Sequence, residues 1–298
     1  MKIKGTNTSV TLSDIPKILG LSSLAGIVIR CIQMAKFIDN ETGFATGGKF
    51  FSVVLMLGLV VAVLAIVVKA FLSAESEKLQ VQGVKSTPLG AATVFFAVSL
   101  LFDFVSGFTS MGSAGSTGDF KNLMLTGTMP RFIQSIFAVF AAIYFIILAK
   151  DYFKGTQNAS NHRILAIAPV GWAGFRMVCR FVRQISFIRV SDLFLELIML
   201  AMMLIFFMAF AQVLSGVYSE GFRWRLPSFG AAAALIAVTL SIPRLIFTVI
   251  DFEGYINPQH TFQLVDLAFF VFILMFTLTV CKGVNPYTAY DNGNDGEN

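Results

Sequence analysis

The feature that most constrains this chain is the regular recurrence of long apolar blocks. Each block has roughly 20 residues, close to the length that an α-helix needs to cross a hydrocarbon core of about 30 Å at about 1.5 Å rise per residue. The blocks cover residues 17–38, 50–73, 88–109, 131–150, 164–186, 192–216, 228–250 and 264–282. They predict an all-α, polytopic membrane protein with eight transmembrane helices.

The composition supports lipid as the solvent of this chain. Of the 298 residues, 56% are hydrophobic and only 13% are charged, which is about half the charged share of a soluble domain. The net charge is +5, but Lys and Arg are scattered among short loops and helix ends, a pattern typical of membrane orientation rather than of nucleic-acid binding. We therefore expect the lipid bilayer as a partner and no nucleic acid.

The distribution of basic residues predicts the orientation. Eight spans place both termini on one side. That side holds twelve Lys and Arg residues, at positions 2, 4, 17, 69, 78, 85, 150, 154, 163, 223, 225 and 282, against seven on the other side, at positions 36, 49, 121, 131, 180, 183 and 189. Because Lys and Arg are enriched in cytoplasmic loops, the counts predict a multi-pass protein of the plasma membrane with both termini in the cytoplasm.

The segments between and beyond the blocks define the predicted domain organisation. Residues 1–16 form a cytoplasmic N-terminal segment, residues 151–163 a cytoplasmic linker, and residues 283–298 a polar, acidic cytoplasmic tail. The long connection from Thr109 to Met129 is rich in Gly, Ser and Thr, so it has too little apolar area to form a domain. It is either a flexible outer loop or a segment that folds over an outer vestibule.

An internal repeat is the second organising feature. A shift of about 140–146 residues aligns the first three blocks with the fifth, sixth and seventh, and a shift of 132 aligns the fourth with the eighth. In the third pair, Gly-Ala-Ala at 90–92 falls on Gly-Ala-Ala at 230–232. Four pairs in the same order predict two similar four-helix halves, residues 17–150 and 164–282. An even number of spans per half implies a parallel repeat, related by an axis along the membrane normal.

Charged residues inside the blocks are the candidate functional residues, since each costs at least about 2.5–3.5 kcal/mol to insert. In the predicted topology all of them lie in the middle or outer half of the bundle. Together with Trp172, they form the set that we predict to bind a small polar or anionic solute: Arg30, Asp103, Arg176, Arg180, Glu196, Arg244 and Asp266. The alternative is that these charges form salt bridges that fix helix register.

The block at residues 164–186 is the most distinctive. Trp172, Arg176, Arg180 and Arg183 are spaced by four, four and three residues, which places them on one stripe of a helix. One interpretation is that the stripe forms a wall of an outward-facing site. The other is that Arg180 and Arg183 reach outer headgroups while Arg176 pairs with an internal carboxylate. A voltage-sensor ladder is disfavoured, because its usual spacing is three.

Three acids lie at depths that suit a partner for Arg176. Glu196 is the first choice, because its block follows directly after a tight connection and antiparallel neighbours place their outer halves together. Asp103 and Asp266 are the other candidates at compatible depths.

The sequence lacks the residue sets of common catalytic and cofactor sites. His162 and His260 are predicted in loops on opposite sides, and Cys31, Cys179 and Cys281 lie singly inside apolar blocks. There is no HExxH pair, no Cys/His cluster and no Walker A glycine loop. We therefore predict no metal, no cofactor and no enzymatic activity.

These observations lead to two function hypotheses. The first is a small-solute transporter or permease with a polar site in the outer half, between the two repeats. The second is a non-transporting membrane sensor, assembly factor or complex subunit whose charges pair helices. A continuous water-accessible cavity that reaches Arg30, Arg176 and Asp103 favours transport, whereas a solid core with every charge paired favours the second hypothesis.

Overall fold

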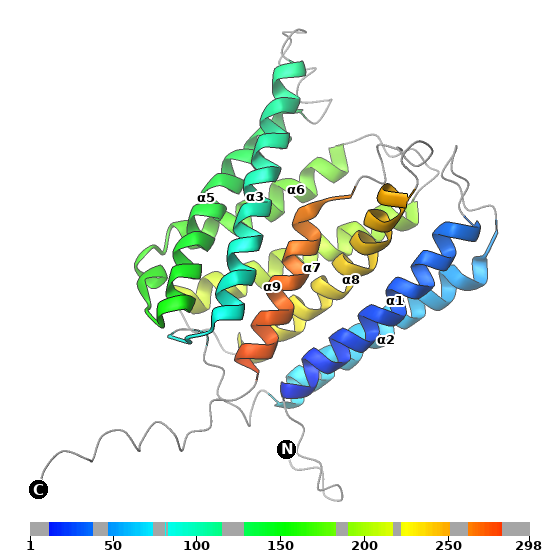
Figure 1. Cartoon of the computed structure of the whole chain (residues 1–298), viewed down its shortest axis with the longest axis horizontal. Helices are drawn as coiled ribbons and strands as arrows, with labels where there is room; N and C mark the ends of the chain where they lie inside the picture. Colours follow the sequence, from blue (N-terminus) through cyan, green and yellow to red (C-terminus); the bar gives the residue numbers. More distant parts are fainter. Residues whose placement is uncertain are drawn as a thin grey trace, which may run out of the picture.

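A computed structural model gives the fold of the chain (Figure 1). The structure describes residues 12–37, 47–73, 81, 83–114, 128–182, 190–216, 222–250 and 262–281. Residues 1–11 of the predicted N-terminal segment, the whole predicted tail at 283–298, and the residues Arg183, His260 and Lys282 lie outside the described residues. Within the described ranges the regular structure is entirely helical, which confirms the all-α prediction.

Each predicted block corresponds to one of eight α-helices in the described part of the chain. They are α1 (Ile15–Phe37), α2 (Lys49–Ser73), α3 (Thr87–Ala114), α5 (Thr128–Lys154), α6 (Ala168–Val182), α7 (Val190–Leu214), α8 (Phe222–Ile250) and α9 (Leu264–Val280). Short 3-10 turns lie at Leu12–Asp14, Asn158–Asn161 and Leu165–Ile167.

The connection from Thr109 to Met129 is more helical than predicted. Helix α3 continues to Ala114 and α5 already begins at Thr128, so a loop over the whole connection was wrong at both ends. A single glycine costs a helix only about 1 kcal/mol relative to alanine, and adding residues to an existing helix is easier than starting one. Residues 115–127 lie outside the described residues.

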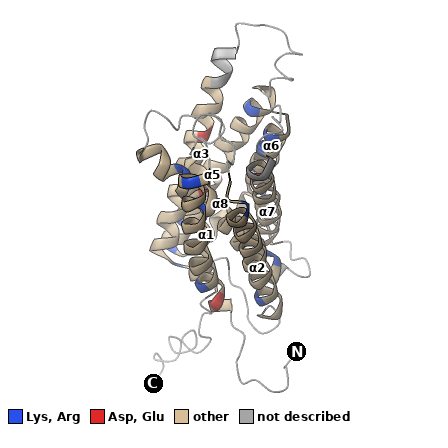
Figure 2. Ribbon diagram, turned by 90° about the vertical axis from the view of Figure 1, so that its right-hand side faces the viewer, with Lys and Arg blue, Asp and Glu red and all other residues tan. Residues whose placement is uncertain are grey.

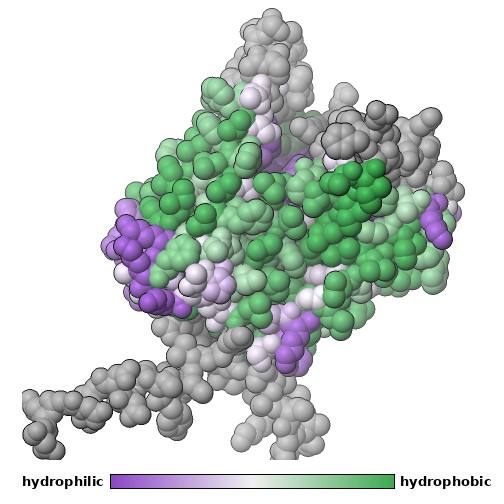
Figure 3. Space-filling view, in the orientation of Figure 1, coloured by the Kyte–Doolittle hydropathy of each residue, from purple (hydrophilic) through white to green (hydrophobic). Residues whose placement is uncertain are grey.

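The helices are compatible with an integral membrane protein. Seven of them are long and apolar enough to span a bilayer: Leu12–Phe37, Lys49–Ser73, Thr87–Thr109, Thr128–Lys154, Leu165–Val182, Leu193–Leu214 and Arg223–Ile250. The eighth, α9, has 17 residues, or about 26 Å. The exact count of eight spans is therefore not confirmed. Most of the length of the helices is free of charge (Figure 2), and hydrophobic side chains cover the flanks of the bundle (Figure 3).

Six of the helices pack as a closed ring. Helix α3 packs on α5, α5 on α6, α6 on α7, α7 on α8, α8 on α9, and α9 returns to α3. The other two, α1 and α2, pack on each other and on α8 (Figure 1). We refer to these parts as the six-helix ring and the hairpin.

This packing does not confirm the predicted four-plus-four repeat. In the second half, consecutive helices pack in chain order from α6 to α9. In the first half, α1 and α2 form the hairpin while α3 and α5 belong to the ring, and α8 is the main neighbour that the hairpin has in the described structure. The two halves thus differ in packing order, and the repeat stays a prediction from sequence.

Helix direction defines two ends of the bundle. Helix α1 begins and α9 ends at the same end (Figure 1). There, Lys69 at the end of α2 lies 3.1 Å from Asp14 before α1, and the Ser86 and Thr279 hydroxyl oxygens lie 3.5 Å apart. We call this the near end and the opposite one the far end.

The hairpin meets the ring through small side chains. A methyl group added at Gly26 of α1 would lie 2.8 Å from the Thr239 hydroxyl oxygen on α8. Helix α1 can approach α8 this closely only because Gly26 has no side chain, as is common where membrane helices pack.

Aromatic side chains fill the ring interior toward the near end. The ring of Phe96 lies 4.8–6.2 Å, centroid to centroid, from five other aromatic rings. The phenylalanines of this aromatic core come from α3, α5, α7 and α9 and are almost fully buried: Phe96, Phe145, Phe206, Phe207, Phe210, Phe269, Phe272 and Phe276. Edge-to-face and stacked contacts among them make this part of the ring densely packed.

Candidate functional site

Charged side chains converge inside the far part of the six-helix ring. Every ring helix contributes at least one member of this charge network, which consists of Asp103 on α3, Arg131 on α5, Arg176 and Arg180 on α6, Glu196 on α7, Arg244 on α8 and Asp266 on α9. Four arginines face three carboxylates, so the network carries one formal positive charge in excess.

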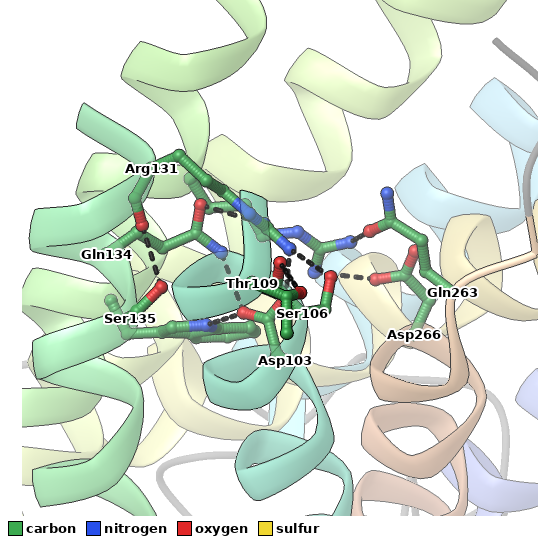
Figure 4. A network of polar contacts seen from close by, with 10 residues as sticks. Asp103, Ser106, Thr109, Arg131, Gln134, Ser135, Gln263 and Asp266 are labelled. Carbon is green, nitrogen blue, oxygen red and sulfur yellow. Dashed lines mark hydrogen bonds and ion pairs between the residues drawn. The ribbon is translucent and has the colours of Figure 1, made fainter. Parts of the chain in front are cut away.

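Asp103 holds α3, α5 and α6 together. Its carboxylate accepts hydrogen bonds from Arg131 Nη2 at 2.8 Å, from Gln134 Nε2 at 2.7 Å and from Trp172 Nε1 at 2.8 Å (Figure 4). Arg131 also donates to Gln134 Oε1 at 3.1 Å and to the Ser106 hydroxyl at 3.2 Å. Three donors on one carboxylate offset much of the cost of removing it from water.

Arg176 joins α6 to the start of α9. Its Nη1 lies 2.7 Å from Asp266 Oδ1, and its Nη2 donates to the side-chain oxygen of Gln263. The guanidinium carbon also lies 5.3 Å from the centroid of the Trp172 ring, within the range of a cation–π contact. The Arg176 side chain is only 3% exposed, so protein groups surround it in place of water; Nη1 and Asp266 Oδ1 form an ion pair but no aligned hydrogen bond.

The prediction that Arg176 pairs with Glu196 was wrong. Glu196 is instead bound by Arg244 Nη1 at 2.6 Å and by Arg180 Nε at 3.2 Å. Helices α6 and α7 do pack together, but the arginine of α6 that meets Glu196 is Arg180, one turn nearer the far end than Arg176. The deeper Arg176 reaches Asp266, a carboxylate on a helix distant in sequence.

A cavity opens beside this network. It has a volume of about 490 Å³, within the range of roughly 300–1,000 Å³ that is usual for small-molecule sites. Its walls come from α3, α5, α6, the first turn of α9 and the two residues before it: Ser99, Phe102, Asp103, Ser106, Arg131, Gln134, Arg176, Cys179, Arg180, Phe262, Gln263, Leu264 and Val265. Three arginines and one carboxylate line it, an excess of two positive charges.

The network lies in the far half of the bundle. At about 1.5 Å per residue, Asp103 lies about 24 Å along α3 from Thr87, and Asp266 about 21 Å along α9 from Val280. A hydrocarbon core is about 30 Å thick. Asp103 and Asp266 thus lie past the middle of a span of that thickness, toward the far end; that this end faces the outside stays a prediction.

Arg30 is the exception in the predicted set. Its Nη1 donates to Gln33 Oε1 at 2.7 Å, and Gln33 donates to the Ser52 hydroxyl on α2 at 2.7 Å. Arg30 therefore lies in the hairpin and is not among the residues that line the cavity. The structure gathers the other predicted residues, namely Asp103, Trp172, Arg176, Arg180, Glu196, Arg244 and Asp266, and their role in binding a ligand stays a prediction.

Three residues of the site were missed from sequence: Arg131, Gln134 and Gln263. The sequence pattern places Arg131 among the basic residues of the outer side, because the apolar block begins there. A helix that begins three residues earlier, as α5 does, places Arg131 and Gln134 on one face, three positions apart. Gln263 lies just before α9, and no sequence pattern marked it.

The described residues contain no group of three or more His, Cys, Asp and Glu side chains that could hold a metal ion. Comparison with protein-family models, with curated proteins and with solved structures finds no match to this chain. The chemistry of the charge network and its cavity is therefore the basis for assigning a function.

Proposed function

We propose that this chain is an integral membrane protein that binds a small anion in the far-end cavity, and that it works as a permease for this anion in the plasma membrane. The observation that carries the proposal is the convergence of three guanidinium groups, from Arg131, Arg176 and Arg180, on one cavity that contains a single carboxylate. Planar guanidinium groups bind carboxylate and phosphate oxygens in pairs.

The arginines are already ordered for such a ligand. Carboxylates behind the cavity wall hold Arg176 and Arg180, and Asp103 holds Arg131. An anion that enters meets donors whose positions are already fixed. Binding then costs less free energy, because fewer side chains have to be ordered. The twelve-to-seven bias of Lys and Arg predicts that the near end is cytoplasmic, so the cavity would take its ligand from outside the cell.

A specific observation favours the second hypothesis, a non-transporting membrane sensor or complex subunit. The aromatic core lies between the cavity and the near end, and Trp172 contacts both: its Nε1 donates to Asp103, while its ring lies 6.2 Å from that of Phe207. An anion that moves on to the near end has to displace these rings, whereas a sensor needs only to bind.

Thermal stability of the purified, full-length protein tests the proposal. A ligand that binds only the folded state stabilises it by RT ln(1 + [L]/Kd), about 2.7 kcal/mol at 100 times Kd. We expect at least one of phosphate, sulfate, acetate and glutamate to raise Tm at constant ionic strength. Arg131→Gln should weaken the response, because Arg131 lines the cavity and is 20% exposed, so that the variant can fold.

Arg225→Gln is the matched control, since Arg225 lies over Trp224 at the start of α8, at the near end. If no anion raises Tm, or if both variants respond like the wild type, the cavity is not an anion site. Uptake of the stabilising anion into proteoliposomes then separates the two hypotheses. Accumulation that Arg131→Gln abolishes supports the permease, and binding without uptake supports the sensor.

A further inference from the structure

We infer that the anion bound in the far-end cavity is amphipathic: a phosphate group that carries an apolar chain, with the chain lying in the opening between α3 and α9. This inference rests on the proposed anion site and adds the chemical class of its ligand. It is carried by three features of the cavity, which are its apolar rim, the graded burial of its arginines and its depth in the bundle.

The rim of the cavity is apolar on the side where α3 faces α9. Phe102, Phe262 and Leu264 line the cavity there. Phe102 is also 61% exposed, and its α3 neighbours Leu101 and Val105 are 38% and 54% exposed. Exposed apolar side chains on a membrane-compatible helix face lipid. The same phenylalanine thus borders both the polar cavity and the lipid-facing surface.

The three arginines of the cavity differ in burial. The side chains of Arg131 and Arg180 are 20% and 16% exposed, whereas that of Arg176 is 3% exposed. An inorganic anion needs only the charged interior. A ligand with a charged head and an apolar tail also uses the rim, because its head reaches the guanidinium groups while its tail stays against Phe102 and in lipid.

In the proposed orientation, the cavity lies at the depth expected for the outer headgroup region. Helix α9 begins at Leu264, beside the cavity, and is only about 26 Å long, whereas α3 continues about 16 Å beyond Asp103 to Ala114. A helix shorter than the hydrocarbon thickness draws the headgroup region toward its end. In Figure 3 a hydrophilic patch lies between α3 and α9 within a mostly hydrophobic face. Lipid headgroups can therefore reach the cavity from the side, between α3 and α9.

The experiment compares alkyl phosphates of different chain length. The full-length protein is placed in phosphatidylcholine nanodiscs, and Tm is measured against decyl phosphate, methyl phosphate and inorganic phosphate, with decanol as the uncharged chain. Each methylene removed from water contributes about fourfold in affinity. We expect decyl phosphate to reach half-maximal stabilisation at a concentration at least about tenfold below that of methyl phosphate, and decanol to have no effect.

A pair of variants separates binding at the rim from simple partition into the bilayer. Phe102→Gln makes the rim polar, and Phe108→Gln is its control, since Phe108 is 58% exposed on the same helix and does not line the cavity. The advantage of decyl phosphate should fall at least about threefold in Phe102→Gln, roughly one methylene contact, and be unchanged in Phe108→Gln.

The outcomes are distinguishable. Equal responses to methyl and decyl phosphate overturn the amphipathic ligand and leave the anion site standing, with free phosphate as its ligand. An advantage for decyl phosphate that survives Phe102→Gln overturns the position of the chain between α3 and α9. If none of the phosphates raises Tm while another anion does, the site stands and its phosphate class is wrong. If no anion does, the proposed function fails as well.

Discussion

The two parts of the ring interior are built from the same helices but differ in packing and in charge. Toward the near end, phenylalanines from α3, α5, α7 and α9 interlock, with Phe96 in contact with five aromatic rings. Toward the far end, the same helices carry Asp103, Arg131, Glu196 and Asp266, and a cavity of about 490 Å³ remains. One part is dense and apolar, and the other is open and ionic.

This difference between the two parts indicates what keeps a cavity open inside a membrane protein. Apolar side chains can rearrange to fill space, because their contacts have no fixed direction. Guanidinium and carboxylate groups are held by hydrogen bonds of defined distance and angle. The charge network can therefore hold the far parts of the helices at fixed separations, while the aromatic core packs their near parts closely.

The largest loss of stability is expected when one partner of the ion pair between Arg176 and Asp266 is removed. Arg176→Leu leaves the Asp266 carboxylate without the guanidinium that lies 2.7 Å away, in a site where that side chain is 8% exposed. Removing one partner of a buried pair costs about 3–5 kcal/mol. We expect this substitution to cause a larger loss of stability than any of those that follow, measured as a fall in Tm in detergent.

The double variant Arg176→Leu with Asp266→Leu supplies the control. Replacing both members of a buried pair by apolar residues is often close to neutral, so most of the lost stability should return. Ligand-induced stabilisation should not return, because the cavity has lost a guanidinium. A double variant as unstable as Arg176→Leu would contradict the account, since the loss would then come from packing rather than from an unpaired charge.

The next largest effect is expected in the aromatic core. Phe96→Ala removes a ring that lies 4.8 Å from Phe145 and 5.7 Å from Phe272, centroid to centroid. Core Phe→Ala substitutions in soluble proteins cost about 3–5 kcal/mol. The lower end of this range is expected for Phe96→Ala, because lipid also solvates the ring in the unfolded state.

Phe140→Ala is the matched control for Phe96→Ala. Phe140 lies on α5 and is 49% exposed, so lipid already surrounds much of its ring. Its replacement should change Tm little. Equal losses in the two variants would mean that the aromatic core contributes no more to stability than the lipid-facing surface. The aromatic core would then not be the densely packed, stabilising part of the ring.

Much of the helical plan could be predicted from sequence, because block length and charge placement are local properties. Each apolar block contains one helix, and the depth of Asp103 and Asp266 followed from their position along their own helices. The need of Arg176 for a carboxylate was predicted in the same way. These results depend on the cost of placing a charge or a polar backbone in lipid, which acts on each helix separately.

The partners and the packing order could not be predicted in the same way. Glu196 was preferred for Arg176 because neighbouring helices were expected to share their charges, but the ring closes through α9 and brings Asp266 to Arg176 instead. Apolar helices fit many neighbours, so their composition does not decide which ones touch. The spacing of Phe269, Phe272 and Phe276 by three and four residues was a signal for a shared aromatic face that the sequence interpretation did not use.

The smallest effect on stability is expected for an ion pair that is partly exposed to water. Asp14 contacts Lys69 at 3.1 Å and Lys17 at 3.3 Å at the near end, but its side chain is 33% exposed and that of Lys17 is 77% exposed. Water already solvates these charges, and exposed ion pairs contribute little to stability. Asp14→Asn should therefore leave Tm unchanged within experimental error in moderate salt.

Asp266→Asn should, by contrast, lower Tm clearly, because it removes the same charge from a partner that is 3% exposed. Both variants remove one carboxylate charge from an ion pair, and Asp266 is much the more buried of the two acids. The ratio of their effects therefore indicates how strongly burial amplifies an ion pair in this bundle. Equal effects would mean that water reaches Arg176 and Asp266 freely. The far part of the ring would then be a solvated opening rather than a shielded, ordered site.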